Sequence, residues 1–405
     1  MRTVGLLALL LASAGPTLRA QDFFDRLDER LTFSAFGDNL RARVSGTLDL
    51  EFYLFQEPAP ALIDANGNKL FNPRLTLFFD TQMGPQFYFF SQLRFDRAFD
   101  PTDHPDAEVR LDEYALRYTP WDDGRLSVQV GKFATVVGNW VGRHLSWDNP
   151  FINAPLAYEN VTPLEDMVAP SASYYYDGEL HDEKYEYIPV IWGPSYASGV
   201  SVAGRFGKLE YAAEIKNASL SSRPESWDAT RIGFEHPTFS GRLGFRPNQM
   251  WNFGFSASNG AYFRPDAEPT LPLGKDIGDY HQTVLGQDMS FAWHHLQIWA
   301  EVHEARFAVP TLGNADTLTY YIEAKYKFAP QLFGAVRWGQ QFFSNVPNGY
   351  GGEIPWSHDI SRIEGAVSYR FTPHTQLKLE YFLQYEERAR REISHTFATQ
   401  FTLRF

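Results

Sequence analysis

Charged residues recur at alternate positions in the last third of the chain, where they could act on ions in water. In four segments rich in large apolar residues, the basic side chains share the face opposite the apolar one. These are Lys325, Lys327, Arg337, Arg362, Arg370 and Lys378. Some acidic residues share that face, so each cation could simply be solvated or paired sideways. Taken together, a basic wall of this kind could filter solutes by charge.

The segment 134–196 carries the opposite sign. It contains nine acids against Arg143 and Lys184, which gives a net charge of −7. The acids are Asp148, Glu159, Glu165, Asp166, Asp177, Glu179, Asp182, Glu183 and Glu186. If this segment faced the basic wall, the two sets of charges would produce a field across the space between them. The alternative is a surface loop that binds divalent ions or sugar head groups without specificity.

No motif in the chain predicts catalysis. The eleven histidines are scattered, and neither a His-Glu-x-x-His pattern nor a nucleophile elbow is present. The stretch "DANGNK" at residues 64–69 resembles the start of a calcium loop. No glutamate follows at the required distance, so an Asn-Gly turn explains it better. We therefore expect no enzyme activity, no cofactor and no metal site.

The elements that must position these charges are strands. Large apolar residues alternate with polar ones in sixteen segments, each typically 9 to 14 residues long. In "QLKLEYFLQYEE", for example, Leu377, Leu379 and Leu383 share one face, whereas Lys378 and Glu380 share the other. Short turns and long polar loops connect the segments in alternation. This pattern predicts an all-β fold, a transmembrane antiparallel β-barrel of about 16 strands.

The overall composition fits a barrel better than other classes. The chain has 405 residues, a formal charge of −13, no cysteine and no later run of 18 apolar residues. Helical membrane spans and a disulfide scaffold are therefore not expected. The acidic balance argues against a nucleic-acid partner. A soluble all-β protein would have to pack the polar faces of sixteen strands against one another. In a wide barrel, these polar faces can instead surround a water-filled interior.

The two ends of the chain support export and closure of the barrel. Residues 1–20 read as a signal peptide, with Arg2, a short apolar run and a helix breaker at Pro16. Residues 21–40 form a periplasmic segment in which "QDFFDRLDERL" has helical spacing, and residues 41–405 form the barrel. The chain ends on an alternating strand at Phe405. In a closed barrel the last strand pairs with the first, so neither edge is left open.

These features together resemble bacterial outer-membrane porins. The stretches "LDEYALRYTPWDDGRLSVQVGKFATVVG" and "PLAYE" resemble the phosphate-selective porin superfamily in particular. The resemblance implies a multi-pass barrel among the lipids of the outer membrane, with short periplasmic turns and long extracellular loops. It also implies that the barrel-assembly machinery reads Phe405, that the acidic segment 134–196 folds into the pore, and that a homotrimer is a candidate assembly.

The expected function is a passive diffusion channel for small hydrophilic or ionic solutes. In that reading the six basic residues line the pore, and Asp148, Glu159, Glu165 and Asp166 lie at the constriction. Two alternatives stay open. One is a substrate-specific outer-membrane channel, for phosphate or other anions or for polysaccharide export, and the other is a soluble all-β binding protein.

Overall fold

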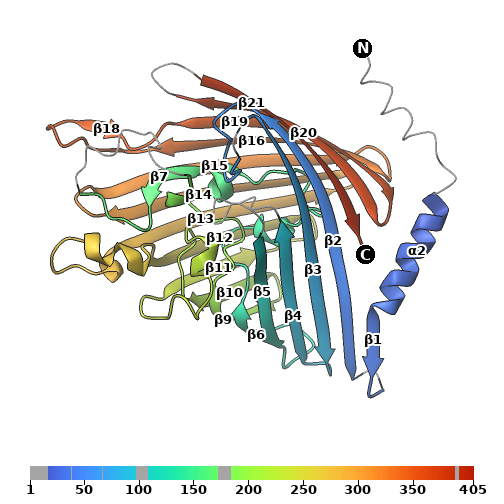
Figure 1. Cartoon of the computed structure of the whole chain (residues 1–405). Helices are drawn as coiled ribbons and strands as arrows, with labels where there is room; N and C mark the ends of the chain where they lie inside the picture. The colour runs from blue at the N-terminus through green and yellow to red at the C-terminus, as the bar shows by residue number, and fades with distance from the viewer. Residues whose placement is uncertain (1–16, 38, 66, 97–107, 172–183, 388–391) are drawn as a thin grey trace, which may run out of the picture.

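Sixteen strands form one closed antiparallel barrel (Figure 1). The computed structural model describes residues 17–37, 39–65, 67–96, 108–171, 184–387 and 392–405. Within them the barrel strands are β2 (Leu40–Phe55), β3 (Lys69–Met83), β4 (Phe87–Asp96), β5 (Glu108–Tyr118), β6 (Ser127–Lys132), β9 (Ser198–Phe206), β10 (Leu209–Lys216), β11 (Thr238–Phe245), β12 (Trp251–Ala261), β13 (His281–Trp293), β14 (Leu296–Val309), β15 (Gly313–Lys327), β16 (Leu332–Phe343), β19 (Ile360–Thr372), β20 (Thr375–Glu386) and β21 (Glu392–Arg404). The predicted strand number and antiparallel topology are confirmed.

The barrel is apolar outside and polar inside. On β20, Lys378 is 0% exposed and Glu380 1%, whereas Leu379 is 41% exposed and Tyr381 46%. The other strands repeat this inverted burial pattern, so large apolar side chains cover the outer surface. A soluble protein rarely exposes an apolar surface of this extent. The outer face therefore suits the hydrocarbon of a membrane, as the alternation in the sequence predicts.

The barrel closes between its first and last strands. β2 pairs with β21 in a register that sets Leu50 opposite Phe401. At the end of the seam, the backbones of Gly46 and Phe405 exchange two hydrogen bonds, of 2.9 and 3.0 Å. The short strand β1 (Thr32–Ala35) then pairs with the start of β2, beyond the end of β21. Along the described part of β2, the edge that faces the seam therefore pairs with β21 or with β1.

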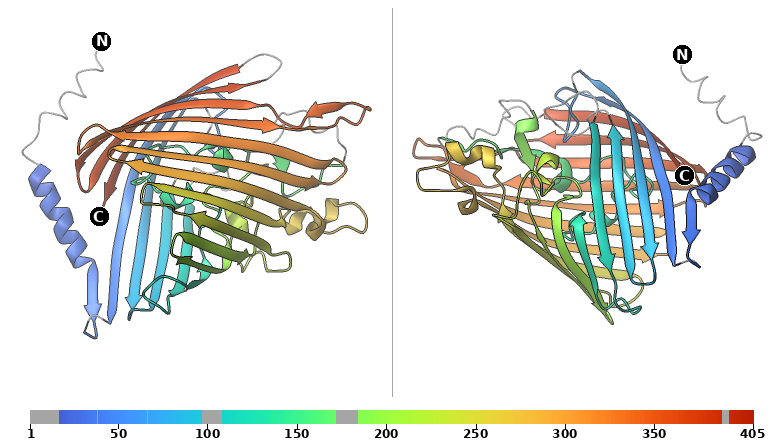
Figure 2. Two further views of the ribbon diagram at one scale, coloured as in Figure 1. Left: turned by 180° about the vertical axis from the view of Figure 1, so that it is seen from behind. Right: turned by 60° about the horizontal axis from the view of Figure 1, so that its bottom comes forward.

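The two ends of the barrel differ. The turns β3–β4, β5–β6, β9–β10, β11–β12, β13–β14, β15–β16 and β19–β20 are short and lie at one end, which also carries α2 (Thr17–Arg30) and the C-terminus (Figure 2). The opposite end carries the long loops, although residues 310–312 alone connect β14 to β15. Helix α2 begins before the predicted signal cleavage after Ala20. The cleavage itself stays a prediction. No helix among the described residues is long and apolar enough to cross a membrane.

The long loops contain small elements of their own. The connection from β6 to β9 holds η1 (Val141–Arg143), α3 (Leu156–Glu159), β7 (Val161–Glu165), η3 (Lys184–Glu186) and β8 (Tyr187–Pro189). Later loops hold η4 (Pro224–Ser226), η5 (Pro265–Thr270), η6 (Ile277–Asp279), β17 (Asn345–Pro347) and β18 (Glu353–Pro355). A hairpin between the stretches "ASYYYDG" and "YEYIPV" of this loop is another expectation from the sequence. The first stretch lies outside the described residues, and β8, which lies in the second, pairs with β7.

Candidate functional site

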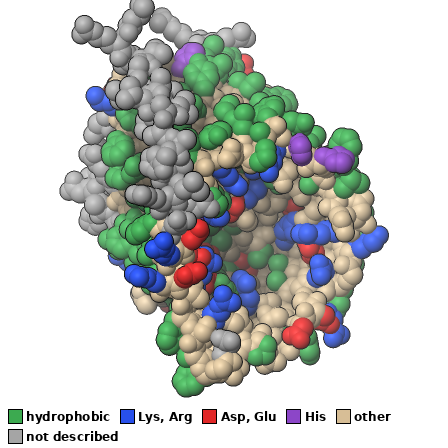
Figure 3. Space-filling model, turned by 90° about the vertical axis from the view of Figure 1, so that its right-hand side faces the viewer, with side chains coloured by type: hydrophobic (Ala, Val, Ile, Leu, Met, Phe, Trp, Pro, Cys, Tyr) green, Lys and Arg blue, Asp and Glu red, His purple; other side chains and the backbone are tan. Residues whose placement is uncertain are grey.

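The interior of the barrel is the candidate site, and one segment of chain occupies much of it. From the end with the short turns the molecule is hollowed, and Lys and Arg side chains gather around the hollow (Figure 3). The described residues of the segment between β6 and β9, 133–171 and 184–197, contact inward-facing side chains of β14, β16, β19 and β20. We call it the lumen segment. Three groups of polar contacts and one apolar cluster hold it in place.

Glu301 of β14 makes the first group of contacts and is 0% exposed. Its carboxylate accepts hydrogen bonds from the backbone N–H groups of Asn139 and Trp140, the latter at 2.7 Å, and from the Tyr158 hydroxyl at 2.6 Å. The chain turns here at Gly138, whose φ is +76°. A Cβ atom at this glycine would lie 2.3 Å from the Tyr158 hydroxyl oxygen. A glycine is therefore required where the lumen segment approaches Glu301.

The basic wall makes the second group of contacts. Arg337 donates hydrogen bonds to the backbone carbonyls of Asn153 and Ala154, at 2.9 and 3.1 Å, and is paired with Glu364. Arg362 pairs with Glu159 of α3 at 2.6 Å and also donates to Ala154. The backbone carbonyls at this bend of the lumen segment therefore accept hydrogen bonds from guanidinium groups of the basic wall. Charge-assisted bonds of this kind are stronger than neutral ones.

Lys378 of β20 continues this row, since its ammonium group donates to the carbonyls of Ser146 and Phe151. Arg337, Arg362 and Lys378 are each 1% exposed or less. The three side chains point into the barrel, where the lumen segment covers them. Their burial means that a solute in the present structure would not reach their charged groups.

The third group of contacts consists of two further ion pairs. Arg143 of the lumen segment pairs with Glu323 of β15 at 2.6 Å and lies over the ring of Trp299, 4.4 Å from its centre. Asp166 pairs with Arg223 of the β10–β11 loop at 2.5 Å. Both pairs are largely buried. Breaking either would leave a charge without its partner inside the protein, which is costly.

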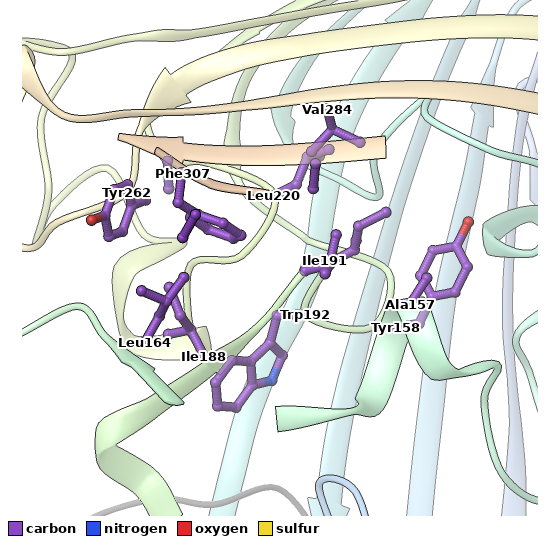
Figure 4. Packing of buried hydrophobic residues seen from close by; sticks show 14 of the residues in the cluster. Ala157, Tyr158, Leu164, Ile188, Ile191, Trp192, Leu220, Tyr262, Val284 and Phe307 are labelled. Atoms are coloured by element: carbon purple, nitrogen blue, oxygen red, sulfur yellow. The ribbon is translucent and has the colours of Figure 1, made fainter. Parts of the chain in front are cut away.

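An apolar cluster fills part of the barrel beside the long loops. Leu164, Ile188, Ile191 and Trp192 of the lumen segment pack with residues of neighbouring loops and strands (Figure 4). The other members drawn and labelled are Ala157, Tyr158, Leu220, Tyr262, Val284 and Phe307. Such a core excludes water from the region that it fills. Any passage through the barrel must therefore run beside the cluster.

A cavity of about 140 Å³ lies between the lumen segment and the wall formed by β2 to β5. The wall contributes three arginines and two aspartates, and the lumen segment contributes aromatic and amide side chains. The charged wall residues are Asp49, Arg74, Arg94, Arg110 and Asp112. Each arginine has an acidic partner: Glu51 for Arg74 at 2.5 Å, Asp96 for Arg94 at 2.5 Å, and Asp112 for Arg110. This wall combines both signs of charge.

A second cavity, of about 260 Å³, lies toward the long loops. Residues 56–61 of the β2–β3 loop line it together with Asn160, Lys184 and Glu386. The Lys184 ammonium donates to the carbonyls of Ala59 and Ile63, at 2.7 and 2.9 Å. Burial lowers the pKa of Lys184 to about 8. The lumen segment thus also holds the β2–β3 loop that borders this cavity.

The remaining predicted site residues fall into two sets. Lys325 and Arg370 lie toward the short turns and are partly exposed, whereas Lys327 at the end of β15 is exposed. Of the predicted constriction acids, Asp148 is exposed, whereas Glu159 and Asp166 are buried in ion pairs. Glu165 is partly buried at the end of β7. The four acids therefore do not form one cluster.

Several important residues were absent from the predicted site. Glu301 and Arg110 face inward on the alternation of their strands, which is a signal that the sequence contains; the same alternation places Arg74 and Arg94 in the lumen, although they were not among the predicted site residues. Arg404 likewise shares the polar face of the last strand. Arg223 lies in a loop without alternation, so nothing in the sequence singled it out. Among the described residues, no group of three His, Cys, Asp or Glu side chains could hold a metal ion.

Comparisons with known proteins identify the fold. No family model and no curated protein matches the chain. Solved structures do match: OmpF of Salmonella typhi in complex with daunomycin has a TM-score of 0.57 at 11% identity, with 92% of this chain and 100% of that chain covered. The anion-selective porin of Comamonas acidovorans has a TM-score of 0.55 at 9% identity, with coverage of 90% and 100%.

A third match is OmpT, an outer membrane protein of Vibrio cholerae, in a trimer form. Its TM-score is 0.54 at 10% identity, with 90% of this chain and 99% of that chain covered. At such low identity these likenesses concern the fold alone. The chain therefore has the sixteen-stranded barrel fold of bacterial outer-membrane porins.

Proposed function

We propose that the chain is an outer-membrane porin, a passive diffusion channel for small hydrophilic or ionic solutes. The observation that carries this proposal is the lumen segment, described for residues 133–171 and 184–197, inside a barrel whose outer face is apolar. Sixteen strands enclose a space wider than side chains alone can fill. The infolded segment narrows that space and leaves the cavity beside β2–β5, where charged and polar groups can replace water contacts of a passing solute.

In this proposal the predicted basic wall has two roles. Arg337, Arg362 and Lys378 hold the lumen segment by bonds to its carbonyls and to Glu159. Lys325 and Arg370 are left to act on solutes, together with the mixed charges of the opposite wall. Asp148 is the predicted constriction acid best placed to meet solutes, because it alone of the four is exposed.

The remaining expectations from the sequence become parts of the same proposal. Residues 1–20 direct export, outer-membrane lipids surround residues 41–405, and the assembly machinery reads Phe405. A homotrimer is the proposed assembly, supported by the trimer form of the similar Vibrio cholerae protein. The channel needs no catalytic group, and the absence of enzyme activity stays a prediction.

The experiment that tests passive diffusion is swelling of liposomes that contain the purified protein. Liposomes loaded with an impermeant polymer are diluted into isotonic arabinose, glucose, sucrose or raffinose, and the swelling rate is recorded for each. The proposal predicts swelling that falls steeply with sugar size, because the lumen segment restricts the passage. Absence of swelling with every sugar, for protein that migrates as a folded barrel on gels, would contradict it. Protein-free liposomes are the control.

A further inference from the structure

The helix α2 and the strand β1 attach to the barrel beside its seam, at the end with the short turns. Asp25 of α2 pairs with His374 in the β19–β20 turn at 2.9 Å, and Asp28 pairs with Arg43 of β2 at 2.8 Å. Helix α2 therefore lies along the rim of the barrel, next to the C-terminus (Figure 2). We call residues 23–37, which include most of α2, β1 and the turn into β2, the rim segment.

Strand β1 continues the outer, apolar surface of the barrel. Along the edge of β2 that β21 leaves free, Val44 donates its backbone N–H to the Leu31 carbonyl at 3.0 Å, and Ala42 pairs with Phe33. Ala42 shares the alternation of Leu50, which is 37% exposed on the outer face. Because paired residues of neighbouring strands share one face of a sheet, Phe33 also points outward. Its side chain is 60% exposed and extends the surface that faces lipid.

The apolar stripe of α2 has flanks of opposite charge. Phe23 and Leu27 are four residues apart and share this stripe. The two acids that pair with the barrel lie on one side of it. Arg26 and Arg30 lie on the other side and are exposed, as is Phe23, at 61%. Helix α2 thus directs its acidic flank toward the barrel and leaves exposed an aromatic side chain bordered by two cations.

Phe36, in the turn between β1 and β2, is the most exposed of the aromatic side chains in the rim segment. It is 80% exposed, and its φ is +55°. A positive φ is unfavourable for a bulky residue, and this side chain gains little from packing within the chain. Burial of the ring outside the protein would offset that unfavourable conformation. Phe23, Phe33 and Phe36 are therefore three exposed aromatic side chains in one short stretch.

Aromatic side chains beside arginines are typical of segments that lie in a membrane interface. The rings enter the boundary between headgroups and acyl chains, and guanidinium groups match phosphate oxygens. The rim segment is continuous with the lipid-facing surface of β2, so lipid is its nearest apolar neighbour. We propose that the rim segment is an interfacial anchor that docks on anionic phospholipids of the leaflet at the short-turn end. This inference rests on the membrane location of the proposed channel, and concerns residues expected from the sequence to be periplasmic.

The test measures the immersion of single nitroxide labels in lipid. The chain contains no cysteine, so a single introduced cysteine carries the label without background. The folded protein is reconstituted into phosphatidylglycerol vesicles, and collisions of the label with O2 and with a water-soluble nickel chelate are compared. Phe33→Cys and Ser34→Cys lie on opposite faces of β1. We expect the label at position 33 to collide mainly with O2 and the label at position 34 mainly with nickel.

The helix offers a second matched pair. Phe23→Cys places the label on the apolar stripe of α2, whereas Glu29→Cys places it on the exposed polar side. We expect the same contrast here, with O2 contact at position 23 and nickel contact at position 29. Equal access of nickel to positions 23 and 29, and to positions 33 and 34, would overturn the proposal.

Failure of the anchor and failure of the membrane location are distinguishable. Val336→Cys, at a position 62% exposed on the outer face of β16, reports whether the barrel itself is inserted. Lipid contact at position 336 together with nickel access at positions 23 and 33 would overturn the anchor alone. Nickel access at position 336 as well would overturn the membrane location of the barrel. Spin–spin broadening at position 33 that persists on dilution with lipid would show that a second copy covers the segment, which also overturns the proposal.

The double variant Arg26→Gln/Arg30→Gln tests the headgroup contacts, with the label at Phe36→Cys. A basic residue near an anionic surface strengthens binding about fivefold. The variant should therefore lower the ratio of lipid-immersed to water-exposed label about fivefold per arginine in phosphatidylglycerol vesicles, and leave it unchanged in phosphatidylcholine. The control Lys208→Gln/Lys327→Gln removes two exposed charges elsewhere at the short-turn end and should behave as wild type. An unchanged ratio in the arginine variant on phosphatidylglycerol would contradict docking on anionic lipid.

Discussion

At the scale of single residues, the inward-facing arginines have different tasks that their position on a strand does not reveal. Arg337 and Arg362 share the alternation of Arg370, yet the first two lie under the lumen segment and the third remains partly exposed. Alternation decides whether a side chain points to lipid or to the lumen. Whether another piece of the chain then covers it depends on tertiary contacts. The inward orientation was therefore predictable from the sequence, and the accessibility was not.

Arg362→Gln should loosen the lumen segment. The substitution leaves Glu159 buried without its guanidinium partner and weakens the bond to Ala154, a change that typically costs about 3–5 kcal/mol. The barrel strands keep their own pairing, so we expect the protein to fold but to show a larger and noisier unitary current in planar bilayers. The matched control is Arg306→Gln, because Arg306 forms an exposed ion pair with Asp316 at the long-loop end. A current identical to wild type in Arg362→Gln would show that this ion pair does not hold the segment.

His144 should make stability depend on pH. Its Nδ1 lies 2.5 Å from the Val141 carbonyl and its Nε2 lies 2.6 Å from the Tyr196 hydroxyl, and Asp112, Asp148 and Arg74 are the charged groups that act on it. Burial lowers the pKa of His144 from its ordinary value of 6.5. As the pH falls, His144 therefore binds a proton at a higher pH in the unfolded chain than in the folded protein. The folding stability that neutral His144 contributes above pH 6.5 is lost as the pH falls below that value.

The measurement is thermal unfolding in detergent between pH 7.5 and 5, with His144→Gln as the variant. One proton contributes a slope of at most about 1.4 kcal/mol per pH unit. The wild type should lose more stability than the variant over this range, and the difference isolates His144 from the other titrating groups. The control His281→Gln, at the end of β13, should behave as wild type. Parallel pH profiles for wild type and His144→Gln would rule out this contribution.

At the scale of elements, alternation predicted the strands well because each residue of a barrel strand meets either lipid or the lumen. The bounds were less predictable. For β3 the alternating stretch "RLTLFFD" predicts a strand over residues 74–80. The observed strand extends from Lys69 to Met83 and includes Pro73. β4 pairs with β3 only from Leu75 onward, so Pro73 lies beyond that ladder and its missing N–H is tolerated there. The lumen segment has no alternation, so its inner path could be suggested only by resemblance.

The seam between β2 and β21 should be sensitive to one methyl group. A Cβ atom at position 46 would lie 2.8 Å from the Phe405 ring and 2.8 Å from the Thr76 carbonyl oxygen. Gly46→Ala should therefore destabilise the closed barrel by about 1–3 kcal/mol through overpacking. Gly365→Ala is the matched control, because nothing lies within 4 Å of its added Cβ. Heat-modifiable gel migration reports the folded fraction. Equal folded fractions and unfolding temperatures for both variants would show that the seam tolerates the methyl group.

At the scale of the whole molecule, the chain combines an apolar exterior with a charged interior, and fills part of that interior with its own loop. The exterior follows directly from the sequence pattern. The structure of the interior depends on hydrogen bonds from wall residues such as Arg337 to backbone carbonyls of the lumen segment. It also depends on the apolar cluster around Trp192, which the alternation of the strands does not predict. The result is a wide barrel with a cavity beside β2–β5, where the proposed passage runs.

The central claim is that this passage conducts, and the most direct test is the unitary current of the purified, folded protein in planar bilayers. The account predicts discrete steps of current that are proportional to voltage and rise with KCl concentration, as for a water-filled pore. Protein that migrates as a folded barrel and inserts into the bilayer, yet produces no current above that of the bare membrane, would contradict it.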